Sequence, residues 1–67
     1  MNDDPSSPIT SFDWQNIKTG KRYRIVTLAV AEETIQPVVV YRSVETGAVW
    51  VRPAAEFFDG RFADTRR

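Results

Sequence analysis

The sequence predicts a small all-β domain, and three observations support that prediction. Residues 38–44 and 48–52 are rich in Val, Tyr and Trp, which suit a pleated, half-buried surface. The loop between them, Glu45-Thr46-Gly47, ends in a glycine, as three-residue hairpin loops often do. A third run, residues 22–31, contains the β-branched segment Ile25-Val26-Thr27. We therefore expect a β-hairpin preceded by at least one long strand.

The composition limits the class of protein. Sixty-seven residues provide for one small domain with a single core. The chain has no cysteine and no histidine, which excludes disulfides and removes the usual general base and the commonest metal ligand. Nine basic residues balance nine acidic ones, whereas non-specific polyanion binders normally carry net positive charge. With neither a transmembrane run nor a signal-peptide pattern, we expect a cytoplasmic protein without cofactor or metal.

The first third of the chain is expected to contain an arm, a short strand and a turn. Residues 1–11 are polar and contain two prolines, so we expect a flexible arm before a single domain at residues 12–63 and a polar tail at 64–67. Phe12 and Trp14 are two residues apart, which predicts a short strand within residues 10–17. The following turn would place Gly20 in the positive-φ region.

Residues 22–31 form the longest β-like run. Both of its faces become apolar in the second half, which predicts a strand that is covered on both sides there or strongly bent. Ala, Leu and Glu in residues 28–33 favour a helix instead, but the β-branched residues favour the strand. Residues 32–34 are the next loop, and Pro37, which lacks an amide proton, should begin the following strand or lie at a sheet edge.

The hairpin admits two registers. A loop of residues 45–47 places Arg42 opposite Trp50 and Tyr41 opposite Val51, and we prefer this register because of the glycine position. Its core face would carry Val39, Tyr41, Val49 and Val51, and its other face would carry Val40, Arg42, Val44, Trp50 and Arg52. A loop longer by one residue would place Tyr41 opposite Trp50 instead.

The C-terminal part completes the predicted fold. Pro53 should stop the hairpin, and residues 54–58 should form one helical or 3₁₀ turn that places Phe57 or Phe58 in the core. Asp59-Gly60 indicates a turn, and residues 61–63 a short closing strand. About five short strands, with a helical turn before the last one, describe a small SH3-like barrel, a fold that limits exposed strand edges.

Residues 20–58 also resemble the DUF1653 family, which consists of small bacterial domains of unknown function. The matching residues are Tyr23, the Glu33-Thr34 pair, Pro37, the run Val39-Val40-Tyr41-Arg42, and Trp50-Val51-Arg52-Pro53 followed by Phe57. The resemblance implies an SH3-type barrel and implies no activity. The family usually has an aromatic-x-His-x-Lys-Gly run before the second strand, where this chain reads QNIKTG, and a second family histidine aligns with Ala31. Any role of those histidines is expected to be absent here.

The best candidate binding residues are Arg42, Trp50 and Arg52. Two guanidinium groups beside an indole could grip a carboxylate or phosphate. The alternative, favoured because such pairs are routine in sheets, is that Arg42 stacks on Trp50 while Arg52 pairs with Glu33 or Glu56. Tyr41 could also line a peptide groove with Phe57 and Phe58, although a barrel this small needs most of its aromatic side chains in the core.

A second candidate is the basic turn, residues 18–24. Lys18, Lys21, Arg22 and Arg24 surround Tyr23, an arrangement typical of single-stranded nucleic acid binders. The zero net charge favours a solvated turn that balances Asp13 and the acidic N-terminal arm. The carboxylates available for catalysis are Glu32, Glu33, Glu56 and Asp59, and no Ser or Thr has an activating histidine.

We therefore expect a non-catalytic binding or accessory module. A protein or peptide partner, or self-association as a homodimer, is the main hypothesis, although the sequence names no partner. Weak binding of RNA or single-stranded DNA through the basic turn is the alternative, and a role as part of an enzyme is third. Salt dependence separates the first two, because only nucleic acid binding should weaken steeply with added salt.

Overall fold

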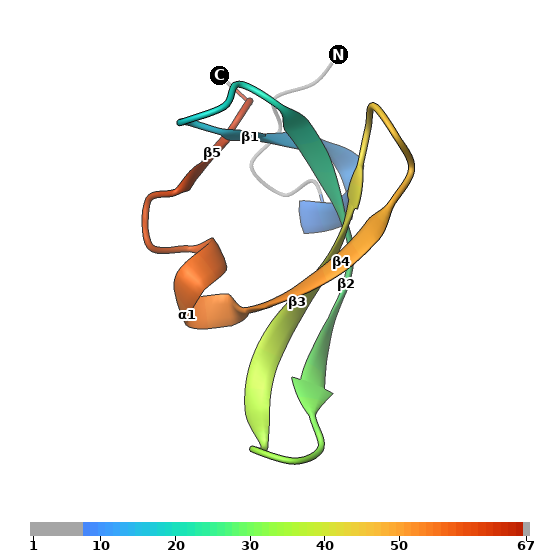
Figure 1. Ribbon diagram of the computed structural model, residues 1–67, viewed down its shortest axis with the longest axis vertical. Helices are drawn as coiled ribbons and strands as arrows, with labels where there is room; N and C mark the ends of the chain where they lie inside the picture. The colour runs from blue at the N-terminus through green and yellow to red at the C-terminus, as the bar shows by residue number, and fades with distance from the viewer. Residues whose placement is uncertain (1–7, 67) are drawn as a thin grey trace.

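The computed structural model describes residues 8–66, which form one antiparallel five-stranded sheet in the order β4-β3-β2-β1-β5 (Figure 1). The strands are β1 (Asp13–Asn16), β2 (Arg22–Ala31), β3 (Gln36–Ser43), β4 (Val49–Pro53) and β5 (Phe62–Asp64). A 3₁₀ turn, η1 (Ile9–Ser11), precedes β1, and a short helix, α1 (Ala54–Phe57), connects β4 to β5. The predicted all-β class, with a helical turn before the last strand, is confirmed. No helix within residues 8–66 is long and apolar enough to span a membrane.

Most elements lie where the sequence predicts them. The strand predicted at residues 22–31 is β2, so the helical alternative for this segment is wrong. Gly20 and Gly47 have φ angles of 78° and 80°, the conformations expected of them in their turns. The predicted arm, residues 1–11, lies mostly outside the described residues, but its last three residues form η1, and Ile9 packs against the core.

The core is a small cluster with an aromatic centre. Its buried hydrophobic residues are Ile25, Val39, Tyr41, Phe57 and Phe62. The rings of Phe57 and Phe62 are stacked with their centroids 4.3 Å apart, and Tyr41 meets Phe57 edge-on at 5.2 Å. Phe57 thus brings α1 against both β3 and β5. Of the two phenylalanines considered for the core, Phe57 is fully buried and Phe58 is 46% exposed.

The preferred hairpin register is wrong, and the alternative with the longer loop is found. Tyr41 pairs with Trp50, and Val40 pairs with Val51. The loop is residues 44–47, because the Ser43 amide donates to the Ala48 carbonyl at 2.8 Å. The physical reason lies in Ser43, whose buried hydroxyl accepts a hydrogen bond from the Thr46 amide at 3.0 Å and so closes a four-residue turn.

The shifted register reverses the predicted faces of β4. Val51 was expected in the core and is 62% exposed, and Val49 is exposed as well. Both valines lie on the outer face of the sheet, because directly paired residues share a face and their partners, Val40 and Arg42, alternate with the buried Tyr41. A register shift of one residue therefore turns the side chains of β4 that were predicted to be buried toward solvent, and the others toward the core.

The β2–β3 hairpin extends beyond the core (Figure 1), and its extended part is called the hairpin arm, to distinguish it from the predicted N-terminal arm. The β2–β3 register shifts between Ile25 and Thr27, which marks a bulge of the kind that bends a strand. Beyond it, Leu28 and Val30 are exposed. The apolar second half of β2 is therefore explained by the bend, and the expected cover on both of its sides is not found among residues 8–66.

The tip of this arm contains a strained residue. Ile35 has a φ of 56°, in the left-handed region that β-branched residues avoid, and its side chain is 71% exposed. We expect Ile35→Asn to stabilise the domain by about 1 kcal/mol, because asparagine tolerates this conformation and little buried area is lost. Urea unfolding measures the change, with Thr34→Asn as a control at a neighbouring residue without positive φ. A lower urea midpoint for Ile35→Asn would contradict the expectation.

Candidate functional site

The structure divides the four predicted binding residues between the two faces of the sheet. Trp50 pairs with Tyr41, and Arg52 pairs with Val39, so Tyr41, Trp50 and Arg52 lie on the inner face that holds the core. Arg42 pairs with Val49 and lies on the outer face. Tyr41, Trp50 and Arg52 are thus brought together, whereas Arg42 is separated from them. The predicted cross-strand stack of Arg42 on Trp50 is wrong, because it required the other register.

Arg52 is held in place by three different contacts. Its Nε donates to the Tyr41 hydroxyl at 3.4 Å, and its guanidinium lies 5.8 Å from the centre of the Phe62 ring. One terminal nitrogen is 3.6 Å from a carboxylate oxygen of Glu56, which confirms Glu56 as the acidic partner. The hydrogen bond to Tyr41 is the main cause that raises the pKa of Arg52, and the nearby Glu56 adds to it. Arg52 is therefore a fixed positive charge at the margin of the core.

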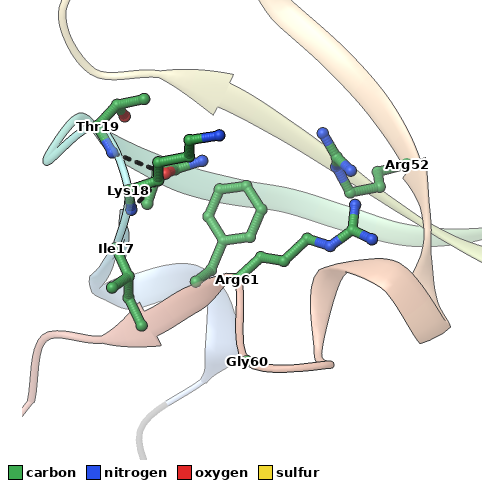
Figure 2. Close-up of a pocket in the computed structure, with 8 residues that line it drawn as sticks. Ile17, Lys18, Thr19, Arg52, Gly60 and Arg61 are labelled. Carbon is green, nitrogen blue, oxygen red and sulfur yellow. Dashed lines mark hydrogen bonds between the residues drawn. The ribbon is translucent and has the colours of Figure 1, made fainter.

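A pocket of about 430 Å³ opens beside Arg52 (Figure 2). Its lining residues come from the end of β1, the β1–β2 turn, β4, the turn before β5 and the start of β5. They are Asn16, Ile17, Lys18, Thr19, Arg52, Gly60, Arg61 and Phe62. Figure 2 shows Lys18 and Arg52 on opposite sides, with the Arg61 side chain extending toward the side of Arg52. Every charged residue of the lining is a cation, and the volume is within the usual range for ligand pockets.

Hydrogen bonds to Asn16 hold the β1–β2 turn in place beside the pocket. The Asn16 side-chain oxygen accepts hydrogen bonds from the amides of Lys18 and Thr19 at 2.9 and 3.0 Å. The Gly20 amide donates to the Asn16 carbonyl at 2.7 Å, and the positive φ of this glycine completes the turn. These contacts hold the backbone of Lys18 at the rim of the pocket.

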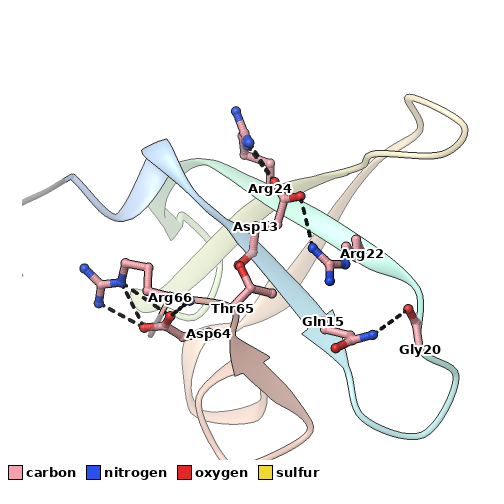
Figure 3. Close-up of polar contacts among 8 residues, drawn as sticks. All are labelled: Asp13, Gln15, Gly20, Arg22, Arg24, Asp64, Thr65 and Arg66. Atoms are coloured by element: carbon pink, nitrogen blue, oxygen red, sulfur yellow. Dashed lines mark hydrogen bonds and ion pairs between the residues drawn. The ribbon is translucent and has the colours of Figure 1, made fainter. Parts of the chain in front are cut away.

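The predicted basic cluster is not one positively charged patch. Asp13 accepts hydrogen bonds from Nε and a terminal nitrogen of Arg24 at 3.1 and 2.7 Å, and its other oxygen is 3.9 Å from Arg22 (Figure 3). Tyr23 packs against the core, with its ring 5.4 Å from that of Tyr41. Asp13 therefore offsets part of the positive charge of this turn. Lys18 and Lys21 are its remaining basic residues.

Two of the four candidate carboxylates are engaged in ion pairs. Asp59 lies 3.1 Å from Arg61, and Glu56 lies 3.9 Å from Arg61 in addition to its contact with Arg52. Glu32 and Glu33 are exposed in the β2–β3 loop. Within residues 8–66 no cluster of Asp, Glu, His or Cys could hold a metal ion. Glu56 and Asp59 therefore serve to position the arginines beside the pocket.

The outer edge of β4 is the second notable feature. The Ser43–Ala48 pair is hydrogen-bonded, and because such pairs alternate in antiparallel ladders, Trp50 and Arg52 also bond to β3. The amide and carbonyl groups of Val49 and Val51 then point away from β3. Since β4 is an edge strand of the sheet formed by residues 8–66, these groups face an unpaired edge. Pro53, which has no amide proton, ends this edge.

Comparison with known protein families gives a match. The sequence model of a family described as "Protein of unknown function (DUF1653)" matches residues 18–65, well over half of the chain. No curated protein and no solved structure matches the chain. The matched segment includes β2, β3, β4, α1 and β5, and with them the unpaired edge and the pocket lining except Asn16 and Ile17. The chain therefore belongs to the DUF1653 family.

Proposed function

We propose that this domain is a non-catalytic binding module that takes up an extended segment of a protein partner along the edge of β4. The observation that supports the proposal is the unpaired edge itself, flanked by exposed apolar side chains. Val49 and Val51 direct backbone donors and acceptors outward, and Trp50 between them is 54% exposed. An unprotected strand edge is the template that strand addition uses, with backbone hydrogen bonds for affinity and side-chain contacts for specificity.

Trp50 would supply much of the binding energy. Tryptophan is enriched among interface residues with large energetic effects, and here its ring lies on the inner face beside Tyr41 rather than within the core cluster. A segment added along β4 would place side chains over the exposed part of this indole. The partner is therefore expected to contribute an apolar residue opposite Trp50.

A second copy of the chain is a special case of the same proposal. Antiparallel pairing of β4 with β4 of another molecule would be symmetric and would bury both tryptophans. Sedimentation velocity across a concentration series separates the two cases. A concentration-dependent dimer indicates self-association, whereas a monomer leaves the edge available to a different protein.

The test is selection of linear peptides from a random library against the wild-type domain. We expect β-prone peptides that lose at least about tenfold in affinity for Val51→Pro, because proline removes an amide that would bond to the peptide and that makes no bond to β3. Val51→Thr is the matched control and should bind normally. Equal affinity of the selected peptides for wild type and Val51→Pro would contradict the proposal.

Nucleic acid binding remains the alternative outcome of this test. Lys18 and Lys21 lie in the β1–β2 turn and have no ion pair within residues 8–66. The alternative predicts that single-stranded oligonucleotides bind the domain, that binding falls steeply between low and moderate salt, and that Val51→Pro has no effect. The zero net charge and the ion pairs of Arg22 and Arg24 with Asp13 favour the protein partner.

A further inference from the structure

We infer that the pocket beside Arg52 is a carboxylate site, which receives an Asp or Glu side chain of the segment bound along β4. The inference rests on the proposed function for the source of the carboxylate. The evidence for the site itself comes from the charges of the pocket, its size and its position relative to the β4 edge.

The lining presents an excess of positive charge. Lys18, Arg52 and Arg61 line the pocket, whereas Glu56 and Asp59 contact the two arginines without lining it. Glu56 lies 3.6 and 3.9 Å from these arginines, which is beyond hydrogen-bonding distance. Each guanidinium has five N–H donors, so donors remain for a ligand oxygen. The Lys18 ammonium makes no ion pair with any residue in the described range 8–66.

The charge balance favours a single carboxylate. Three cations against two carboxylates leave one net positive charge around the pocket, which one carboxylate would neutralise. Ile17 and Phe62 supply the apolar part of the lining, suited to the methylene groups of an acidic side chain. Planar guanidinium groups match the geometry of a carboxylate.

The position of Arg52 connects the pocket with the β4 edge. Arg52 and Trp50 are two residues apart and lie on the same face of the strand. A strand paired with β4 places the residue opposite Arg52 on that face too, with the two Cβ atoms about 5 Å apart. The bound segment would therefore carry its acidic residue two positions away from the residue opposite Trp50, with its side chain directed toward the pocket.

The first experiment tests the pocket on the free domain, without any partner segment. The probe is N-acetylglutamate N-methylamide, titrated into ¹⁵N-labelled protein, with the glutamine analogue as the neutral control. We expect saturable shifts for residues of the pocket with the glutamate probe alone, and their loss in Lys18→Gln and Arg61→Gln. Lys21→Gln is the matched control, because Lys21 lies in the same turn and does not line the pocket. Equal responses to both probes, or equal loss in Lys21→Gln, would overturn the inference.

The second experiment tests the partner segment. A selected peptide with a Glu at the predicted position should bind at least about fivefold more tightly than its Gln analogue, and this difference should disappear in Arg61→Gln but persist in Lys21→Gln. Peptides that depend on Val51 but show no preference for Glu would overturn the carboxylate site and leave the proposed function intact. Saturable binding of the glutamate probe in the absence of any edge-dependent peptide would support the site and contradict the proposed function.

Discussion

Phe57→Ala is expected to destabilise the domain by about 3–5 kcal/mol, which is most of the stability that a domain of this size can have. Phe57 is fully buried, and its ring stacks on Phe62 and meets the edges of Tyr41 and Trp14. Removing it leaves a cavity at the centre of the core and detaches α1 from the sheet. Urea unfolding followed by far-UV circular dichroism should show a chain that is largely unfolded without denaturant.

Substitutions of two other residues, Phe58 and Val51, provide controls for this prediction. Phe58→Ala removes the adjacent ring, which is about half exposed, and should cost clearly less than Phe57→Ala. Val51→Ala should change the stability by less than about 1 kcal/mol, because its side chain faces solvent. A large loss of stability in Val51→Ala, together with a small loss in Phe57→Ala, would contradict this register of β4 and favour the one that places Tyr41 opposite Val51.

Trp50→Ala is expected to leave the fold intact and to abolish most of the partner binding. The stability should fall by about 1 kcal/mol or less, since the indole lies outside the core cluster and is half exposed. Affinity for a segment selected on the β4 edge should fall by about 30-fold, the effect of about 2 kcal/mol that is typical of a tryptophan at the centre of an interface. The expected effects on folding and on binding are therefore very different.

Isothermal titration calorimetry measures the affinity, and quenching of tryptophan fluorescence checks the exposure of the indole. The quenching experiment needs a Trp14→Phe background, because Trp14 also fluoresces and packs against the core. Quencher should reach Trp50 in the free domain, and the bound segment should shield it. A Trp50→Ala protein that is unfolded, or one that binds the segment as tightly as wild type, would contradict the prediction.

The positions of the strands could be predicted from local sequence. The β-branched residues of β2 and the glycines of the turns are local signals, and the structure places β2 at the predicted residues. The hairpin register could not be predicted in the same way. Gly47 was correctly expected to have positive φ, but the loop length depends on Ser43, whose hydroxyl accepts from Thr46 and adds one residue to the turn. A local polar contact thus decided which face of β4 is buried.

The pocket could not be predicted, because it is formed by residues distant in sequence. The sequence predicts only a closing strand for Arg61 and Phe62. Their place in the pocket depends on the pairing of β5 with β1, which brings Phe62 opposite Asn16. Arg52 was identified from its place beside Trp50, and Lys18 as part of a basic turn. Nothing in the local pattern indicated that both would lie at the same pocket.

The basic turn shows how strand pairing can engage residues that a sequence pattern indicates as functional. Arg22 and Arg24 alternate with Tyr23 as nucleic acid binders do, but β1 pairs with β2 so that Asp13 lies opposite Arg24. The tyrosine then points into the core and the arginines pair with the carboxylate. Cross-strand pairing, which is fixed by the whole sheet, determined which of these side chains remain available to a ligand.

Amide hydrogen exchange at β4 tests the central claim most directly. In the free domain, the amides of Val49 and Val51 should exchange much faster than those of Trp50 and Arg52, because only the latter two bond to β3. Addition of a selected segment should slow exchange at Val49 and Val51 and leave Trp50 and Arg52 unchanged. Protection of Val49 and Val51 in the free monomer, or fast exchange there in the saturated complex, would contradict strand addition at this edge.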